Sequence, residues 1–234
     1  MAIKLAKQFI GQIFQNYNGI SCFNNLQHFF RWRRSLFEGA TPVSDEQPWI
    51  TFDAIQYLEE KVQSNHKIFE FGGGGSTLFL LKRCQEVVTV EHDAEWFHSL
   101  KQLVEDKKLE NWVGRLVEPE QGNLVESPSA SEPDHYSSGG TKGVNYKDYA
   151  SLIDTYPNEY FDIVLVDGRS RPACIKHAAP KLKKGGLIVL DNADRSYYLG
   201  SAVKNILSEY SLVLSTKGAS PYVPFFTQTN IWKK

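Results

Sequence analysis

The side chains best suited to chemistry in this sequence are carboxylates and an amide that follow short apolar runs. Asp167 follows residues 161–166, and Asp191 and Asn192 follow residues 187–190. Carboxylate and amide oxygens that converge on one point form a hard-oxygen set suited to Mg²⁺ or a similar ion. They could instead orient or activate an acceptor hydroxyl, or merely hold a substrate and cap a turn. Asp167, Asp191 and Asn192 are therefore the predicted catalytic residues and the predicted metal ligands.

A glycine-rich stretch offers a second kind of chemistry, the binding of a ligand by exposed backbone N–H groups. The apolar run 67–71, which contains Glu70, leads into Gly72 and three further glycines, followed by Ser76 and Thr77. This order predicts a strand, a tight turn and the N-terminus of a helix. Glycine lets the backbone turn sharply and lets a ligand approach without a Cβ in the way. The alternative is a glycine-rich loop that only turns the chain.

The ligand predicted for this turn carries positive charge. A dinucleotide fingerprint needs glycine or alanine at its third position, where this sequence has Thr77. Glu70 stands two residues before the first glycine, where it would repel a pyrophosphate and favour an ammonium or sulfonium group. S-adenosylmethionine has both of these cationic groups. Glu91 lies 21 residues after Glu70, a spacing suited to a ribose hydroxyl of either cofactor.

Alternating strand and helix patterns position these residues. Short apolar runs predict strands and amphipathic runs predict helices: strands at 67–71, 87–91, 113–117, 161–166, 187–190, 212–214 and 225–232, helices at 94–107, 172–182 and 196–208. This order indicates an open, mostly parallel, doubly wound α/β sheet whose last two strands are antiparallel. Amphipathic helices at 3–17 and 23–36 precede the sheet. Residues 118–145 lack an apolar period, which predicts a lid or a flexible insertion.

Four motifs, at residues 70–76, 90–93, 165–168 and 185–191, resemble those of the class I S-adenosylmethionine-dependent methyltransferases, a Rossmann-like family. The resemblance covers about residues 48–234, the predicted methyltransferase domain. It implies a seven-stranded sheet in the order 3-2-1-4-5-7-6 with an antiparallel last strand. Residues 1–47 would be an N-terminal helical extension, which in such families often shapes the acceptor pocket or forms a homodimer contact.

The resemblance also implies which residues bind S-adenosylmethionine. The turn at residues 72–74 would contact the methionine part, Glu91 the ribose, and His92 would lie near the adenosine. The predicted cofactor-binding residues all lie in or directly after the first, second and fourth strands: Glu70, Gly72, Gly74, Ser76, Glu91, His92 and Asp167.

The pattern of Asp167 and the later Asp191-Asn192 pair is similar to metal-dependent small-molecule O-methyltransferases, in which such residues hold the metal. A bound metal would lower the pKa of an acceptor hydroxyl and so make it a better nucleophile. Those enzymes have a lysine base three residues after the first metal-binding aspartate, where this sequence has Ser170. The base is therefore missing or replaced.

Three arginines near the same strand ends are the predicted substrate-binding residues: Arg169, Arg171 and Arg195. If they face inward, they could clamp a carboxylate or phosphate of the acceptor through paired hydrogen bonds. If they face outward, they belong to the solvated surface.

Composition argues against several other classes of protein. A net charge of −1 over 234 residues gives no general attraction to nucleic acid, so no nucleic-acid partner is expected. No apolar run is long enough to span a membrane. Three widely spaced cysteines argue against a disulfide framework and favour a cytoplasmic protein. We therefore predict a methyltransferase that acts on a small-molecule acceptor, at a hydroxyl oxygen. The alternatives are a nicotinamide-dependent oxidoreductase and a non-catalytic binding module.

Overall fold

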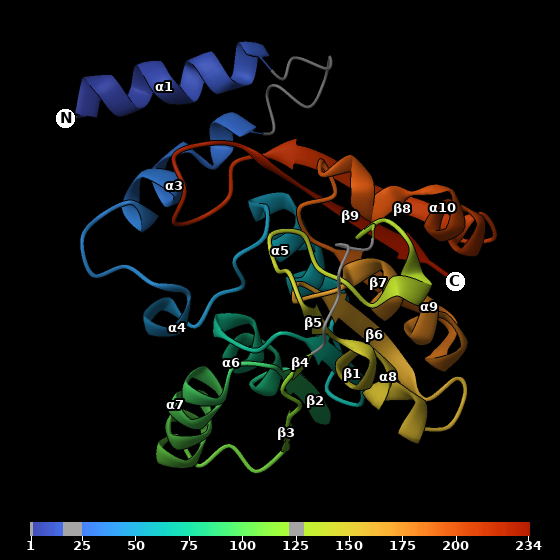
Figure 1. Ribbon diagram of the computed structural model, residues 1–234. Coiled ribbons are helices and arrows are strands. Elements are labelled where there is room, and N and C mark those ends of the chain that lie inside the picture. The colour runs from blue at the N-terminus through green and yellow to red at the C-terminus, as the bar shows by residue number, and fades with distance from the viewer. Residues whose placement is uncertain (1, 16–24, 122–128) are drawn as a thin grey trace.

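A seven-stranded sheet forms the centre of the part of the chain that the structure describes (Figure 1). The structure is a computed structural model that describes residues 2–15, 25–121 and 129–234. Parts of the predicted N-terminal helices and of the predicted insertion therefore lie outside the described residues. The strands of the main sheet are β1 (Lys67–Phe71), β2 (Glu86–Glu91), β3 (Trp112–Leu116), β6 (Phe161–Val166), β7 (Leu182–Leu190), β8 (Ser211–Gly218) and β9 (Thr227–Lys233).

The strand order is β3-β2-β1-β6-β7-β9-β8. β1 pairs in parallel with β2 and with β6, whereas β9 is antiparallel to both of its neighbours, β7 and β8. β4 (Glu120–Gln121) and β5 (Val144–Asn145) form a separate antiparallel pair. With these two short strands set aside, the predicted order 3-2-1-4-5-7-6 and the antiparallel last strand are confirmed.

Helices cover both faces of the sheet, which explains why its strands are continuous apolar runs. Along β1 the side chains alternate: Ile68 belongs to a buried cluster with residues of α5 (Phe52–Lys61), α6 (Gly75–Leu81) and α7 (Ala94–Asp106). Phe69 and Phe71 belong to a second cluster, with residues of α8 (Lys147–Ser151), α9 (Arg171–Lys181) and α10 (Ser201–Leu207). Each fully buried side chain of this size stabilises the fold by about 1.5–3 kcal/mol. The helix predicted at 196–208 is split into the 3₁₀ turn η3 (Ser196–Leu199) and α10 by Gly200.

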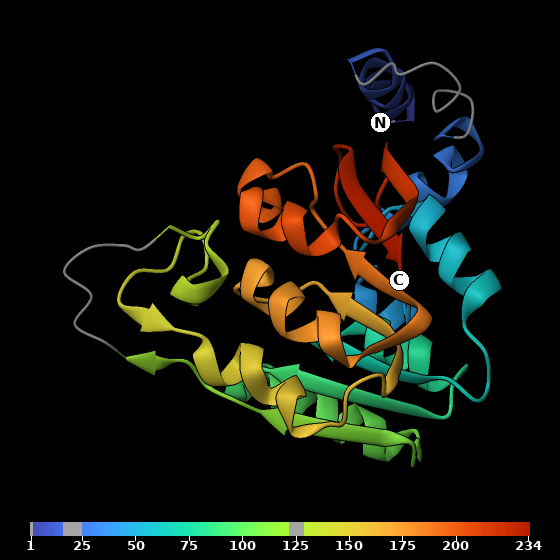
Figure 2. The same cartoon turned by 90° about the vertical axis from the view of Figure 1, so that its right-hand side faces the viewer.

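The N-terminal extension contains α1 (Ala2–Gln15), α3 (Phe29–Ser35) and α4 (Pro42–Asp45). Figures 1 and 2 show α1 at one end of the molecule. The Phe9 ring of α1 lies 4.9 Å from the Trp32 ring and 5.3 Å from the Phe226 ring. Trp32 Nε1 in turn donates a hydrogen bond of 2.9 Å to the carbonyl of Val223. The extension therefore holds the loop that precedes β9.

The described part of the predicted insertion is folded onto the body. The 3₁₀ helix η1 (Pro133–His135) lies beside α9, and Lys176 forms an ion pair with Asp134. Tyr136 Oη lies 3.3 Å from His177 Nε2. These contacts and the β4–β5 pair give secondary structure to a segment for which the sequence predicts none.

Candidate active site

The glycine turn after β1 lies against the turn after β6. Gly72 has a φ of +88°, a left-handed conformation that side chains disfavour. A Cβ on Gly72 would also lie 3.0 Å from the Cα of Gly168. Both features require glycine at position 72, and they bring the carboxyl ends of β1 and β6 together.

The backbone N–H groups of residues 72–74 in this turn are already used by the protein. Each donates a hydrogen bond to a nearby acceptor: Gly72 to the Val90 carbonyl (2.9 Å), Gly73 to Glu91 Oε2 (3.0 Å) and Gly74 to Thr77 Oγ1 (2.9 Å). A pyrophosphate at a glycine-rich turn depends on free N–H groups of this kind. The geometry therefore disfavours a dinucleotide, for a reason that differs from the charge argument made on the sequence.

Glu70 does not line the cavity beside the turn, because it is completely buried beneath α6. Its carboxylate accepts hydrogen bonds from three hydroxyls: Ser76, Thr77 (2.6 Å) and Thr89 (3.0 Å). Burial raises the pKa of Glu70 to about 7, although the three hydroxyls lower it. The alternation along β1 turns Glu70 to the same face as Ile68. This corrects the prediction that Glu70 contacts the cofactor: it supports the start of α6.

Glu91, at the end of β2, holds the next segment of the cavity wall. Its Oε1 accepts hydrogen bonds from the N–H groups of His92 (2.7 Å) and Asp93 (3.0 Å), and Oε2 accepts one from Gly73. Burial raises the pKa of Glu91, but the bonds from His92, Asp93 and Gly73 outweigh it and the pKa falls below its ordinary value. A carboxylate can accept about four hydrogen bonds. Oε2 therefore keeps capacity for one ligand hydroxyl.

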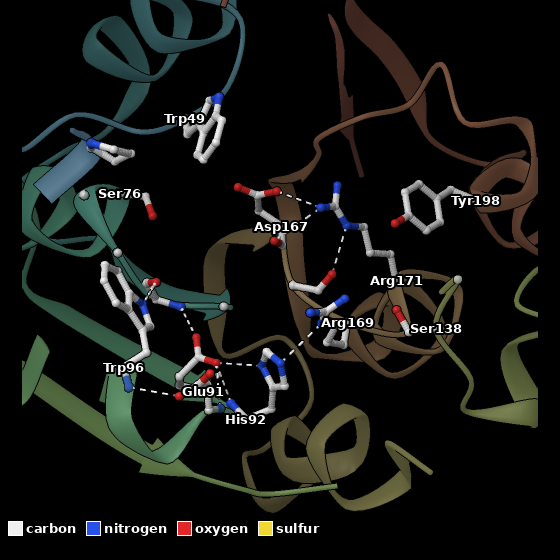
Figure 3. Close-up of a pocket in the computed structure, with 18 of the residues that line it drawn as sticks. Trp49, Ser76, Glu91, His92, Trp96, Ser138, Asp167, Arg169, Arg171 and Tyr198 are labelled. Atoms are coloured by element: carbon white, nitrogen blue, oxygen red, sulfur yellow. Dashed lines mark hydrogen bonds and ion pairs between the residues drawn. The ribbon is translucent and has the colours of Figure 1, made fainter. Parts of the chain in front are cut away.

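His92 lies between Glu91 and Arg169 (Figure 3). Nε2 accepts a hydrogen bond of 3.2 Å from Arg169 Nε, which assigns the proton to Nδ1. Nδ1 lies 2.6 Å from Glu91 Oε1, but the angle between the two groups is not that of a hydrogen bond. Arg169 is thus directed inward, but toward a histidine of the protein rather than toward an acidic group of a ligand.

These groups line a cavity of about 550 Å³ at the carboxyl ends of β1, β2 and β6. Gly72, Gly74 and Ser76 lie on one side of it. Trp96 closes another side, and its Nε1 donates a hydrogen bond of 2.7 Å to the carbonyl of Gly73. The insertion contributes Ser138, so the predicted segment does reach the site. A cavity of this size with few convergent polar groups is typical of a small-molecule site.

Asp167, Arg171 and Asp191 form a charged cluster where β6 and β7 end. Arg171 Nη2 lies 2.9 Å from Asp167 Oδ1, Nη1 donates to the backbone carbonyl of Asp191, and Nε donates to that of Gly168 (3.0 Å). The Arg171 guanidinium also lies over the Tyr198 ring, 4.9 Å from its centre. Burial raises the pKa of both carboxylic acids, and Arg171 opposes the rise.

The residues present do not fit a divalent ion, which corrects the predicted metal site at Asp167, Asp191 and Asn192. Asp191 Oδ1 accepts a hydrogen bond from Thr229 Oγ1 (2.7 Å), and Oδ2 accepts one from the Asn192 amide (2.6 Å). Arg171 supplies the positive charge beside Asp167. No group of three or more His, Cys, Asp or Glu side chains within residues 2–15, 25–121 and 129–234 could hold a metal.

A second cavity, of about 360 Å³, adjoins the first. The two share Trp49, Asp167, Arg171 and Arg195 in their walls. The other residues that line the second cavity lie directly after β7, in the loop before β9 or at the start of β9: Asp191, Asn192, Asp194, Val223, Phe225 and Thr227. The predicted catalytic residues therefore lie together, around this second cavity.

The three predicted substrate-binding arginines have different surroundings. Arg171 is buried and its donors bond protein acceptors, so it cannot also clamp a ligand. Arg169 bonds His92. Arg195 is exposed, lines both cavities and donates to Tyr198 Oη (3.3 Å), with Tyr197 as a second hydrogen-bond partner. Only Arg195 remains suited to an acidic group of a ligand.

Sequence reasoning missed several residues of the two cavities. Trp96 could have been found, because it stands three residues after Asp93 in the first turn of α7, whose N-terminus Asp93 caps. Trp49, Phe225 and Thr227 carried no signal in the sequence. They reach the second cavity only because the tertiary fold brings residues near 49 and 225 beside β7.

Comparisons with known proteins agree with this fold. No protein-family model matches the sequence, and no curated protein is similar to it in sequence. The structure of the O-methyltransferase from Bacillus cereus in complex with SAH aligns with 98% of this chain and 100% of its own, with a TM-score of 0.54 and 16% identity. A proposed methyltransferase from Streptococcus mutans in complex with SAH aligns with 76% of this chain and 94% of its own, with a TM-score of 0.50 and 14% identity. This chain therefore has the fold of the class I S-adenosylmethionine-dependent methyltransferases.

Proposed function

We propose that this protein is an S-adenosylmethionine-dependent methyltransferase that transfers a methyl group to a hydroxyl oxygen of a small molecule. One observation carries the proposal. Two cavities meet at Asp167, and the glycine turn and Glu91 line the first, whereas polar and aromatic side chains line the second. A transferase needs this juxtaposition of a donor site and an acceptor site, because most of its rate comes from positioning.

The first cavity suits S-adenosylmethionine. Gly72, Gly74 and Ser76 would lie along the methionine part, Glu91 Oε2 would accept a ribose hydroxyl, and His92 and Trp96 would flank the adenine. When bound, S-adenosylmethionine supplies a methyl group on a sulfonium, which is activated for transfer to a nucleophile. The paired N–H groups of the turn count against NAD, and hence against an oxidoreductase.

Asp167 is the group we propose as the base that receives the acceptor's hydroxyl proton. Its side chain is 24% exposed, and Oδ1 bonds Arg171. Oδ2 has no hydrogen-bond partner among the described residues, and Figure 3 shows it pointing away from Arg171. Burial raises the pKa of Asp167 above its ordinary value against the effect of Arg171, and a base with a pKa nearer to neutral accepts a proton more readily. This carboxylate would take the place of the lysine that the sequence lacks at position 170.

The second cavity is the proposed acceptor site. Trp49 and Phe225 are half-exposed aromatic walls that suit a planar or apolar acceptor, and Arg195 suits an acidic group on it. The N-terminal extension shapes this cavity indirectly. Gln8 and Trp32 donate hydrogen bonds to the carbonyls of Pro224 (3.0 Å) and Val223 (2.9 Å), which fixes the loop that carries Phe225. A cytoplasmic location stays a prediction that rests on the cysteine usage.

Calorimetry on cofactor-stripped protein tests the donor half of the proposal. We expect heat with S-adenosylmethionine and none with NAD or NADH. Glu91→Ala should weaken S-adenosylmethionine binding by about 1–3 kcal/mol, because a charged hydrogen bond to ribose is lost, and Glu91→Gln should weaken it less. Heat with a dinucleotide alone would support the oxidoreductase instead.

A screen with S-adenosylmethionine labelled in its methyl group tests the acceptor half. Label in a methyl ether would support a hydroxyl acceptor, and label in a methylamine would contradict the oxygen assignment. Tight S-adenosylmethionine binding without transfer to any acceptor would favour the non-catalytic module.

A further inference from the structure

The N-terminal extension has an outward apolar surface that the body of the protein does not cover. We define the N-terminal patch as Ile3, Ile10 and Phe14 of α1 together with Leu26 and Phe30. Phe14 is 72% exposed and Phe30 is 76% exposed, unusually high values for phenylalanine. The spacing of the three α1 residues places them on one side of the helix. A neighbouring side of α1 is buried through Phe9 and Ile13, so α1 is apolar on two adjacent sides.

The N-terminal extension carries an excess of positive charge. Residues 2–37 contain five basic side chains and no Asp or Glu: Lys4, Lys7, Arg31, Arg33 and Arg34. The whole chain has 26 basic and 27 acidic residues, so residues 38–234 have 21 basic residues and a net charge of −6. No ion pair joins any of these five to a carboxylate in the part of the chain that the structure describes. The chain is therefore divided between a cationic extension and an acidic body.

We infer that the N-terminal patch binds the surface of an anionic lipid bilayer. Protruding apolar side chains beside Lys and Arg are the pattern of an interfacial helix, which buries its apolar side among acyl chains while its cations contact headgroups. Such binding needs no shape-matched groove. None of the described helices combines the length and apolar character required to cross a bilayer.

Charge also argues against the simplest alternative, in which the N-terminal patch binds a second copy of this chain. In a two-fold symmetric dimer the same surface faces itself. The predicted homodimer through the N-terminal helices would therefore set five positive charges against five, and like charges repel. An anionic surface instead attracts all of them.

Sedimentation with lipid vesicles tests the inference on the full chain. We expect binding to vesicles of phosphatidylcholine mixed with phosphatidylglycerol, weakened by salt, and little binding to phosphatidylcholine alone. Arg33→Gln with Arg34→Gln should reduce affinity about fivefold for each charge. Phe14→Ser with Phe30→Ser should reduce it about tenfold for each ring. Because Phe14, Phe30 and Arg34 are exposed and Arg33 is only half-buried, the variants should keep nearly the wild-type melting temperature.

Matched controls lie elsewhere on the surface. Lys184→Gln with Lys204→Gln removes two exposed cations, and Leu212→Ser removes an apolar side chain that is 52% exposed. These variants should bind vesicles like the wild type. Equal binding to neutral vesicles, no binding to anionic vesicles, or equal losses in the controls would overturn the inference. So would self-association in analytical ultracentrifugation that Phe14→Ser with Phe30→Ser abolishes, since a second copy would then occupy the patch.

Discussion

The first cavity takes most of its lining residues from three short stretches of chain, residues 72–76, 91–96 and 167–171, whereas the second is assembled from segments far apart in the sequence. In the first cavity, local hydrogen bonds fix the groups: Glu91 accepts bonds from Gly73, His92 and Asp93. In the second, Trp49, Asp191 and Phe225 meet only because β7 and β9 are neighbours and because the N-terminal helices hold the loop before β9.

This difference has a functional consequence if the first cavity binds the donor and the second the acceptor. A donor that stays the same can be bound by a short, self-contained motif. An acceptor site built from several segments can change when any one of them changes. Asp167 and Arg171 line both cavities, so a substitution at either residue could affect the donor site and the acceptor site together.

The largest expected effect is that of Asp167→Asn on turnover. Loss of a general base typically costs about 10²–10⁴ in rate, and we expect a fall of this size with a nearly unchanged dissociation constant for S-adenosylmethionine. Asp194→Asn is the matched control, because it removes a carboxylate from the second cavity alone and should cost much less. Single-turnover methyl transfer and calorimetry measure the two quantities. If the affinity for S-adenosylmethionine falls together with the rate, Asp167 contributes to donor binding, and the proposed separation between a donor site and an acceptor site is contradicted.

The sequence predicted more of the first cavity than of the second for a physical reason. Apolar runs bounded by turns identified each strand of the main sheet, and the family resemblance supplied an order that the structure confirms. The glycine turn and Glu91 carry their own local constraints. The metal prediction failed because no local pattern shows that Arg171, four residues after Asp167, folds back to bond Asp167 and the carbonyl of Asp191.

Glu70 marks the limit of sequence reasoning on the donor side. Glu70 lies beside the turn, as predicted, but its side chain faces α6 and the hydroxyls of Ser76, Thr77 and Thr89. The alternation of β1 contained this information, because Ile68 and Glu70 must share a face. The Glu70 side chain thus supports the turn that lines the cavity rather than touching a ligand.

The next largest expected effect is a change in the pH dependence of stability in Glu70→Gln. The pKa of Glu70 rises from 4.5 in the unfolded chain to about 7 in the folded protein. The contribution of Glu70 to the free energy of unfolding is therefore complete below pH 4.5 and is lost as the pH rises through about 7. The loss amounts to about 3 kcal/mol in the wild type. Because glutamine does not ionise, the difference between the two proteins should shift by this amount between pH 4.5 and 8. Urea unfolding across that range measures it.

The same variant tests the donor side directly. If Glu70 only supports the turn, Glu70→Gln should leave the dissociation constant for S-adenosylmethionine within about threefold of the wild type. A large loss of affinity for S-adenosylmethionine, with no change in the pH dependence of the unfolding free energy, would mean that Glu70 contacts the cofactor.

The smallest expected effect is that of Thr227→Val, which tests whether the acceptor occupies the second cavity. Thr227 Oγ1 is buried in the wall of the second cavity and has no hydrogen-bond partner among the described residues. Such an atom costs free energy until a ligand bonds it, so valine should raise the unfolding free energy by about 1 kcal/mol and raise the acceptor KM a few-fold. Thr51→Val is the matched control, because Thr51 Oγ1 is equally unpaired but lies outside both cavities. Both variants should gain stability, and only Thr227→Val should change KM. Equal KM values in the two variants would mean that the acceptor does not reach β9, and the second cavity would then lose its proposed role.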